Sequence, residues 1–518
     1  MKGSLAKALI AAAVIAFGTD ASAAGPDSLI PSPVGYSTGK AFSAYPAVRI
    51  RERSGKKVSE EFRAMTDTLA SFAAEEAYRL SIGRKVVTIE YASQTGRFRA
   101  LQTLRQLELA GGGIPCCTIW DYPRYRHRGL MIDESRSFKG KDFIKKQLDA
   151  MAILKMNSLH LHLTDAAGWR IQIKSRPELT DKAAWRIGRT YAEWERGGYP
   201  FASAGNDKAY GGFYTTEDLR EIVAYAAERH IQVIPEIEMP GHSMEVNRTY
   251  PEIACRDSSG RSRHFSWDLC PGNEGTFELL EDVLSEVIDI FPCKYIHIGG
   301  DEAVMKDWPL CVNCRRRMQE EGFSEVRQLQ GYLVRRMAQW LSEHGRSVIG
   351  WDEIAEVGLP ADAVVMSWRG RTAGDKAASE GRSVIMSPTT HCYFDYYQDL
   401  IRKEPLAVGE LTSLHWVLTF EPGDDSHILG LQANLWCEKI PTPEHAEYML
   451  YPRLYAISEI GWAPKRQREP EQFRAKARSL LEVFRRLGYN TFDMDSESDF
   501  ARAGMRRKST GELIYPAF

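Results

Sequence analysis

The sequence predicts a (β/α)8 TIM barrel preceded by a small α+β domain, and three observations indicate this fold. From Tyr125 onward, eight short apolar runs of strand length alternate with amphipathic stretches of helix length. No Gly-x-Gly-x-x-Gly turn accompanies the strands, which disfavours the alternative, a doubly wound open sheet. The chain of 518 residues is long enough for two domains with sizeable cores.

Residues 24–122 are predicted to form the small α+β domain. Ala47–Arg51 and Lys85–Tyr91 alternate apolar and polar side chains, as strands with one exposed face do. Val58–Ala74 and Gly96–Leu109 have helical spacing, and a run of three glycines ends the second of these helices.

Residues 123–490 are assigned to the barrel, and residues 491–518 to a C-terminal tail packed on it. The predicted strands are short and apolar: Gly129–Asp133, Ser158–Leu163, Gln232–Ile237, Tyr295–Ile298, Ser347–Trp351, Ala363–Trp368, Ser383–Ser387 and Ile428–Trp436. The predicted helices are amphipathic: Lys141–Lys155, Glu217–Arg229, Phe277–Ile290, Val326–His344, Glu444–Ile460 and Glu471–Leu487. The fifth, sixth and seventh strands are expected to follow one another through short connections.

Residues 1–23 are predicted to be a signal peptide rather than part of the fold. Lys2 and Lys7 give a positively charged start, Ala8–Phe17 is a short apolar run, and Ala21–Ala23 forms an Ala-x-Ala cleavage site. The apolar run is too short to span a bilayer. We therefore expect the mature protein to be exported, to the periplasm or outside the cell.

Charge gives no indication of a nucleic-acid or membrane partner. The chain has 67 Lys and Arg residues against 69 Asp and Glu residues, a formal net charge of −2, and no block of basic residues. We expect neither nucleic-acid binding nor a membrane span, and the oligomeric state stays open.

The nine cysteines can form disulfides if the protein is exported. Cys255 and Cys270 flank one long loop, and Cys311 and Cys314 form a Cys-x-x-Cys pair. A zinc site at that pair needs two more ligands, and none follows it at a suitable spacing. A disulfide that pins the loop, or reduced thiols, is therefore favoured over a metal. With an odd count, at least one cysteine stays unpaired or bonds between chains.

The end of the fourth predicted strand carries two adjacent acids. Gly299 and Gly300 follow the strand, and Asp301 and Glu302 come directly after them. Strand ends at the carboxyl rim of a barrel are where catalytic groups collect. Because neighbours in a regular strand point to opposite faces, the two acids share a pocket only if the backbone bends, which the glycines allow.

The other strand ends supply aromatic rings, carboxylates and histidines. These residues are His162, Asp165, Trp169, Glu236, Glu238, His242, Trp351, Asp352, Glu353, Trp368, Arg369, Tyr393, Asp395, Trp436 and Glu438. Aromatic faces stack on sugar rings and carboxylates bind hydroxyl groups, so the mixture indicates a carbohydrate site. A divalent metal held by His162, Asp165, His242 and Asp301 is the alternative, but we count neither a His-x-His nor a His-Glu-x-x-His spacing in its support. We expect no metal.

At this point the chain resembles glycoside hydrolase family 20, the β-N-acetylhexosaminidases, over nearly the whole mature length. The matching motifs occur in the family's order: Leu101–Leu107, Arg128–Asp133, Leu159–Asp165, Gly168–Arg170, Tyr210–Tyr214, Pro235–His242, His297–Glu302, Gly350–Glu353 and Gln432–Trp436. The small N-terminal domain is also similar to the one that precedes the barrel in this family.

The resemblance implies an exo-acting, retaining enzyme that removes terminal β-linked GlcNAc or GalNAc. Most retaining glycosidases place two carboxyl groups across the scissile bond, whereas this family is substrate-assisted. By resemblance, Glu302 is the general acid and base, and Asp301 orients the 2-acetamido group, whose oxygen attacks to give an oxazolinium ion. Glu302 then needs a raised pKa, and Asp301 must stay ionised.

The resemblance also assigns residues that bind the terminal sugar. Arg128 matches the arginine that hydrogen-bonds the sugar hydroxyls, and Asp395 and Glu438 match acids at O4 or O6. Tyr393 matches the residue whose hydroxyl holds the acetamido oxygen. No cofactor is implied, and the expected partner is a glycan with a terminal N-acetylhexosamine.

Two further groups complete the expected site. Trp351, Trp368 and Trp436 match the box around the acetamido methyl, which would stay empty with a glucose. Asp165 and His242 match a pair that supports the general acid.

The chain departs from the family pattern beside the site. Ala166 and Ala167 stand where many members have Asp-Gln, and Ser137 stands where they often have His. These changes concern the outer pocket. The alternatives left open are a relative that releases a disaccharide or a sulfated hexosamine, a catalytically silent glycan-binding protein, and a peptide or phosphate hydrolase.

Overall fold

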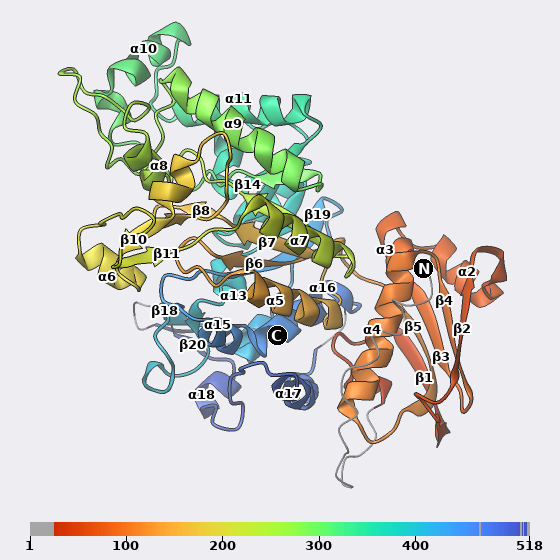
Figure 1. Cartoon of the computed structure of the whole chain (residues 1–518). Helices are drawn as coiled ribbons and strands as arrows, with labels where there is room; N and C mark the ends of the chain where they lie inside the picture. Colours follow the sequence, from red (N-terminus) through yellow and green to blue (C-terminus); the bar gives the residue numbers. More distant parts are fainter. Residues whose placement is uncertain (1–24, 466–467, 508–509, 511, 515–518) are drawn as a thin grey trace.

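Eight parallel strands close into a barrel in the computed structural model, which describes residues 25–465, 468–507, 510 and 512–514 (Figure 1). The predicted signal peptide lies outside the described residues. The barrel strands, in hydrogen-bonded order, are β6 (His127–Asp133), β7 (Ser158–His162), β12 (Gln232–Glu236), β13 (Tyr295–His297), β14 (Ser347–Trp351), β15 (Val364–Ser367), β16 (Val384–Met386) and β19 (Ile428–Leu435). Each coincides with a predicted strand, so the predicted (β/α)8 class is confirmed.

The barrel helices differ from the prediction in two places. The longer ones are α5 (Lys141–Ile153), α7 (Thr216–Ala227), α9 (Glu274–Ile290), α11 (Gln328–Glu343), α12 (Arg371–Ser379), α15 (Pro443–Leu450), α16 (Arg453–Trp462) and α17 (Pro470–Arg486). The single helix predicted over 444–460 is two helices, because Pro452 has no N–H to continue the first. α12 replaces a predicted short connection. Its buried face holds only Gly374, Ala377 and Ala378, which give little apolar signal.

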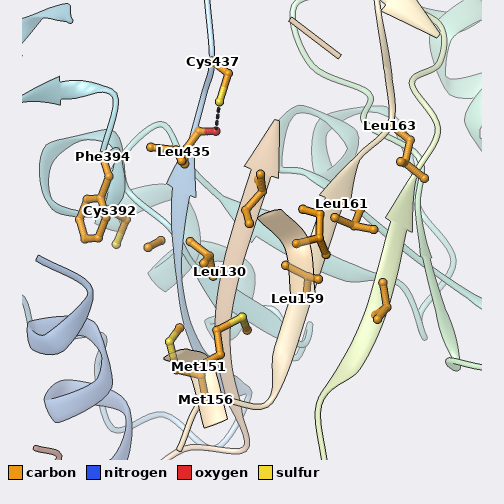
Figure 2. Packing of buried hydrophobic residues seen from close by; sticks show 14 of the residues in the cluster. Leu130, Met151, Met156, Leu159, Leu161, Leu163, Cys392, Phe394, Leu435 and Cys437 are labelled. Carbon is orange, nitrogen blue, oxygen red and sulfur yellow. Dashed lines mark hydrogen bonds between the residues drawn. The ribbon is translucent and has the colours of Figure 1, made fainter. Parts of the chain in front are cut away.

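The alternation within β7 explains how the barrel carries both a core and a polar interior. Leu159 and Leu161 point outward and belong to the same buried hydrophobic cluster as Met151 of α5 (Figure 2). His160 and His162 point inward, as the two-residue period of a strand requires. All four side chains are fully buried.

The N-terminal domain is a five-stranded sheet with α2 (Glu60–Asp67), α3 (Ser71–Glu76) and α4 (Gln94–Ala110). The strand order is β1 (Gly35–Phe42), β5 (Pro115–Asp121), β3 (Tyr78–Ile82), β4 (Val86–Tyr91) and β2 (Arg49–Ser54), with only β2 and β4 parallel.

The prediction missed three of these strands and joined two helices. β1 is largely polar and exposed, so it carries no alternation. β3 does alternate, with Tyr78, Leu80 and Ile82 buried, and this signal was available in the sequence. The helix predicted over 58–74 is broken between α2 and α3.

Buried ion pairs join the N-terminal domain to the amino end of the barrel. The carboxylate of Glu76 accepts from Nη2 of Arg128 at 2.6 Å, and Asp121 accepts from Nζ of Lys155 at 2.6 Å. Nε1 of Trp462 also donates to Asp121, at 2.9 Å. α4 lies between the two domains (Figure 1).

Shorter helices and strands lie in the loops and in the C-terminal tail. They are β8 (Thr164–Asp165), β9 (Gly168–Trp169), β10 (Trp185–Ile187), α6 (Tyr191–Arg196), β11 (Ala209–Gly211), α8 (Met244–Thr249), α10 (Val312–Glu320), α13 (Thr389–Cys392), β17 (Tyr396–Tyr397), β18 (Val408–Leu411), α14 (Leu414–Leu418), α18 (Asp499–Arg502), β20 (Arg506–Arg507) and β21 (Leu513–Ile514). Among the described residues, every helix is too short or too polar to cross a bilayer.

Candidate active site at the carboxyl end of the barrel

The backbone bends sharply where β13 ends, as the glycines predicted. Gly299 and Gly300 have φ angles of 64° and 94°, and Glu302 itself has a φ of 47°. A Cβ on Gly299 would lie 1.7 Å from Oε2 of Glu238, so no larger residue fits there. The bend lets the two adjacent acids face one group. Nε2 of His242 lies 3.6 Å from Oδ2 of Asp301 and 3.6 Å from Oε2 of Glu302.

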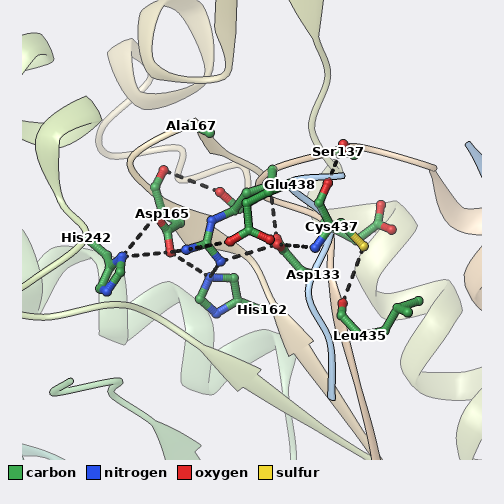
Figure 3. Close-up of polar contacts among 12 residues, drawn as sticks. Asp133, Ser137, His162, Asp165, Ala167, His242, Leu435, Cys437 and Glu438 are labelled. Atoms are coloured by element: carbon green, nitrogen blue, oxygen red, sulfur yellow. Dashed lines mark hydrogen bonds and ion pairs between the residues drawn. The ribbon is translucent and has the colours of Figure 1, made fainter. Parts of the chain in front are cut away.

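His242 is held by Asp165 on its other side (Figure 3). Nδ1 of His242 lies 3.2 Å from Oδ2 of Asp165, which also receives Nη2 of Arg136 at 2.7 Å. Burial disfavours the charged form of Asp165 and would raise its pKa. The positive charges of Arg136 and His242 outweigh burial and lower the pKa of Asp165 well below its usual value. Burial also disfavours the charged form of His242 and would lower its pKa. The negative charges of Asp165 and Asp301 outweigh burial and raise the pKa of His242 well above its ordinary value. One ligand atom each of His242, Asp301 and Glu302 lies within 4.8 Å of the others, so the metal alternative at this rim keeps a candidate ligand set.

The pKa shifts of the two acids run opposite to the prediction. Burial raises the pKa of Asp301 to about 6, with Glu236 and Glu302 adding to it and His242 opposing it. His242, whose Nε2 lies 3.6 Å from its carboxylate, lowers the pKa of Glu302, whose side chain is 60% exposed. The reason is position: Asp301 points into the barrel among other acids, whereas Glu302 points outward.

Arg128 does not reach the site, so its predicted role in binding sugar hydroxyls is wrong. It lies at the start of β6, at the opposite end of the barrel, and is fully buried. Its guanidinium pairs with Glu76 and donates to the backbone oxygens of Lys155 and Tyr125. Parallel barrel strands place their first residues at one end and their last residues at the other, and this polarity separates Arg128 from the pocket.

Arg136, which the sequence reasoning missed, lies in the pocket instead. It follows the end of β6, and its guanidinium is 4.9 Å above the ring of Trp436. Nη2 lies 2.7 Å from Asp165 and 3.6 Å from Oε1 of Glu438, and Nε has no hydrogen-bond partner among the described residues. Its place three residues after a strand end was a signal available in the sequence.

The four aromatic rings predicted for the pocket lie together. Trp351 is 5.8 Å from Trp436, and Tyr393 is 6.4 Å from Trp368 and 6.2 Å from Trp436, measured between ring centroids. Trp351 is buried, whereas Trp368 and Trp436 are half-buried. Nε1 of Trp368 donates to Glu353 at 2.8 Å, which fixes the plane of the ring.

A layer of buried polar groups supports this aromatic cluster from inside the barrel. Glu236 accepts from Nε1 of Trp351 at 2.9 Å and contacts His160, His162 and His297. Burial alone would raise the pKa of Glu236, but the three histidines lower it well below its usual value. His160 and His162 form a His-x-His pair that turns inward, so the sequence reasoning was wrong to count no such spacing. The network of these side chains holds Trp351 in place.

Asp395 and Glu438 offer acceptors to a ligand. Oδ1 of Asp395 and Oε2 of Glu438 are buried without a hydrogen-bond partner among the described residues. Burial raises the pKa of both groups. Buried acceptors of this kind are suited to hydroxyl donors.

A cavity of about 400 Å³ opens at this end of the barrel. Its lining combines four predicted site residues with five that the sequence reasoning did not single out: Asp165, His242, Glu302 and Glu438, with Arg136, Tyr191, Trp267, Val304 and Lys306. A second cavity, of about 530 Å³, lies at the amino end beside α3 and contains none of the predicted site residues.

The departures from the family pattern do not line this cavity. Ala166 and Ala167 are buried in an apolar cluster with Trp194. Oγ of Ser137 donates to the backbone oxygen of Cys437 at 2.9 Å (Figure 3).

One conclusion from the cysteine spacing is wrong. Cys311 and Cys314 do have two further thiols beside them, because Cys255 and Cys270 lie within 4.8 Å. The two partners precede the Cys-x-x-Cys pair in the sequence, in a different loop. None of the nine cysteines, all within the described residues, forms a disulfide.

A (β/α)8 barrel whose carboxyl rim joins paired acids to a tryptophan cluster is typical of enzymes that bind sugars. The chain belongs to glycosyl hydrolase family 20: the model of the family's catalytic domain matches residues 125–465, and that of its domain 2 matches residues 37–122. The resemblance drawn from the motifs is thereby confirmed.

The relatives with the same family features are named β-hexosaminidases. One from Porphyromonas gingivalis is 39% identical over 77% of this chain and 52% of its own length, and one from Vibrio furnissii is 38% identical over 75% and 65%. The chain therefore spans about half to two thirds of these relatives. One from Akkermansia muciniphila is 32% identical over 84% of this chain and 89% of its own.

A solved structure has the same fold. The family 20 exo-β-N-acetylglucosaminidase from Vibrio harveyi, in complex with N-acetylglucosamine, superposes with a TM-score of 0.77 at 28% identity. The match covers 92% of this chain and 80% of that one.

Proposed function

We propose that the protein is an exo-acting, retaining β-N-acetylhexosaminidase that cleaves terminal β-linked GlcNAc or GalNAc by substrate-assisted catalysis. The observation that carries this proposal is the shared contact of Asp301 and Glu302 with His242, which puts both acids on one flank of the pocket. A second carboxylate across the scissile bond would serve as a nucleophile, and adjacent acids cannot fill both positions. The names of the relatives agree with the proposal.

In the first step, the acetamido oxygen of the substrate attacks the anomeric carbon while the bond to the leaving oxygen breaks. Glu302 donates its proton to that oxygen, and Asp301 accepts a hydrogen bond from the acetamido N–H as positive charge develops. In the second step, Glu302 removes a proton from water, which attacks the same carbon and opens the oxazolinium ring. The sugar leaves with its original configuration.

Substrate binding shifts both acids toward these roles. A sugar ring beside Glu302 displaces water from an exposed carboxylate, which raises its pKa and favours the protonated acid. The acetamido N–H, donating to Asp301, stabilises the charged form and lowers a pKa that stands at about 6 without it. His242, held by Asp165, lies beside both acids, so a change in the charge of one acid affects the pKa of the other through His242.

The pocket residues account for selectivity toward N-acetyl sugars. Trp351, Trp368 and Trp436 surround the acetamido methyl, and the hydroxyl of Tyr393 holds the acetamido oxygen. Arg136 takes the role that the sequence assigned to Arg128, because Arg136 lines the cavity that Arg128 does not reach.

Two further assignments concern the sugar and the location of the enzyme. Asp395 and Glu438 accept from the hydroxyls at O4 and O6, since their buried oxygens have no other donor among the described residues. Export rests on the predicted signal peptide. Cell fractionation of a tagged full-length chain tests it, and retention of residues 1–23 on a cytosolic product would contradict it.

The function is tested with aryl β-glycosides. The wild-type enzyme should hydrolyse the β-N-acetylglucosaminide and the β-N-acetylgalactosaminide, and leave the β-glucoside intact. Glu302→Gln should lose several orders of magnitude with a poor leaving group and far less with an activated one, because only the former needs a proton. Full activity of both Glu302→Gln and Asp301→Ala would sink the proposal. Sulfated and disaccharide substrates in the same panel define the specificity.

A further inference from the structure

We propose that Cys255, Cys270, Cys311 and Cys314 bind one structural zinc ion that joins the loop carrying the catalytic acids to the loop carrying His242. The four thiols are buried, and their sulfur atoms all lie within 4.8 Å of one another. The site is separate from the sugar pocket, because none of the four lines that cavity.

The sulfur positions fit a tetrahedron around one ion. Cys255 to Cys314, Cys270 to Cys311 and Cys270 to Cys314 are separated by 3.9, 3.7 and 3.5 Å. A tetrahedral zinc ion with Zn–S bonds of about 2.3 Å spaces its sulfurs by about 3.8 Å. Cys270 and Cys314 each have two sulfur neighbours at such a distance, an arrangement of four equivalent ligands rather than of two separate pairs.

The ligand set and its surroundings select zinc. Four thiolates in a tetrahedron are typical of zinc or iron, and a structural zinc site is closed to solvent. The apolar cluster around the thiols includes Trp308 and Leu329 and excludes water. Cys311 precedes the first residue of α10 and Cys314 lies in its first turn, where the helix dipole favours negative charge.

The backbone around the thiols is already fixed. Oγ1 of Thr276 donates to the oxygen of Cys270 at 2.9 Å, and the amide of Arg263 donates to the oxygen of Cys255 at 2.7 Å. Nε1 of Trp308 donates to the oxygen of Leu269 at 3.0 Å. Such outer contacts hold metal ligands in place.

The position of the four thiols gives the ion a role in the proposed catalysis. Cys255 and Cys270 belong to the long loop after β12, which also carries His242, whereas the segment that begins with Glu302 leads to Cys311 and Cys314. The same two loops meet where Asp268 accepts from the amides of Val304 and Met305 at 3.1 and 2.6 Å. A loop of this length has little regular structure of its own, and an ion that joins it to its neighbour restrains both.

The direct test is the metal content of the purified full-length chain, prepared without chelators. We expect about one zinc ion per chain by mass spectrometry. Cys314→Ser and Cys270→Ser should lose most of it, whereas Cys293→Ser should retain it. Cys293 is a matched control, because it is also buried but donates to the backbone oxygen of Tyr295 at 3.0 Å, away from the four thiols.

The wild-type protein keeps the proposal falsifiable even if the variants fold poorly. An organomercurial should release zinc in step with the modification of four thiols. Disulfides among the four cysteines in non-reduced peptides, four free thiols without metal, or iron in place of zinc would each overturn the assignment. Retention of full zinc in Cys314→Ser would also overturn it.

The role in positioning has its own readout. Removal of zinc should lower the midpoint of thermal unfolding and the kcat/KM for the aryl substrate, and added zinc should restore both. A chain that binds zinc but hydrolyses no aryl glycoside would refute the proposed function and leave the metal site standing. A chain that hydrolyses the aryl glycoside but contains no zinc would refute the metal site and leave the proposed function standing.

Discussion

The two arginines beside the two ends of β6 allow a sharp test, because only one of them should affect catalysis. We consider Arg128→Met and Arg136→Met, which remove a guanidinium and keep most of the apolar stem. Arg128 is fully buried against Glu76 and donates to two backbone oxygens. Breaking a buried pair costs about 3–5 kcal/mol. Arg99 still neutralises Glu76 at 2.8 Å, so we expect about 3 kcal/mol.

The expected change in melting temperature follows from chain size. At about 2.1 cal/mol/K per residue, unfolding of the 518 residues as a unit has an entropy of about 1.1 kcal/mol/K. A loss of about 3 kcal/mol therefore lowers the melting temperature of Arg128→Met by about 3 °C. The kcat/KM of this variant, measured where it is folded, should stay within about twofold of the wild-type value, since no guanidinium atom reaches the pocket.

Arg136→Met breaks a buried pair with Asp165 at 2.7 Å and should also lose stability, but unlike Arg128→Met it should lose activity. A charge-assisted hydrogen bond to a sugar hydroxyl contributes about 1.5–3 kcal/mol, so losing one or two lowers kcat/KM by on the order of 10²-fold. Steady-state kinetics with an aryl β-N-acetylglucosaminide and thermal unfolding by circular dichroism measure both effects. The reasoning is refuted if Arg128→Met loses more than about tenfold in kcat/KM, or if Arg136→Met retains full activity.

Three further predictions concern the geometry around the acids. His242→Gln removes a positive charge that faces both carboxylates, so the pKa values of Asp301 and Glu302 should rise. Both limbs of the pH profile of kcat/KM should therefore move to higher pH, and a shift to lower pH would contradict this. Gly299→Ala should lower kcat/KM by at least tenfold, since its Cβ would lie 1.7 Å from a carboxylate oxygen, whereas Gly345→Ala, with a similar positive φ and open space around it, should only reduce stability; equal activities would argue against the clash. A thiazoline that mimics the oxazolinium ion should inhibit competitively and far more tightly than the released sugar, and indifference to it would exclude acetamide participation.

Local patterns in the sequence were enough to predict the barrel. A strand with one buried face has apolar residues at every second position, and an amphipathic helix has them about every 3.6 residues. All eight strands could therefore be predicted from their own residues, without knowledge of their neighbours. The bend at Gly299 and Gly300 was equally local, because only glycine combines a positive φ with the close approach of a carboxylate. Polar β1 carried no such signal and was missed.

Three properties of the molecule depended on which distant segments meet. Arg128 and Arg136 are eight positions apart, and at about 3.3 Å per residue the strand between them separates one end of the barrel from the other. The pKa values of Asp301 and Glu302 depend on burial and on His242, which comes from the loop after β12. The four thiols come from two loops, and no spacing within either loop reveals the set. Sequence determined the elements and the chemistry at their ends because these are local, whereas tertiary structure decided partners, charge states and ligand sets because long-range contacts create them.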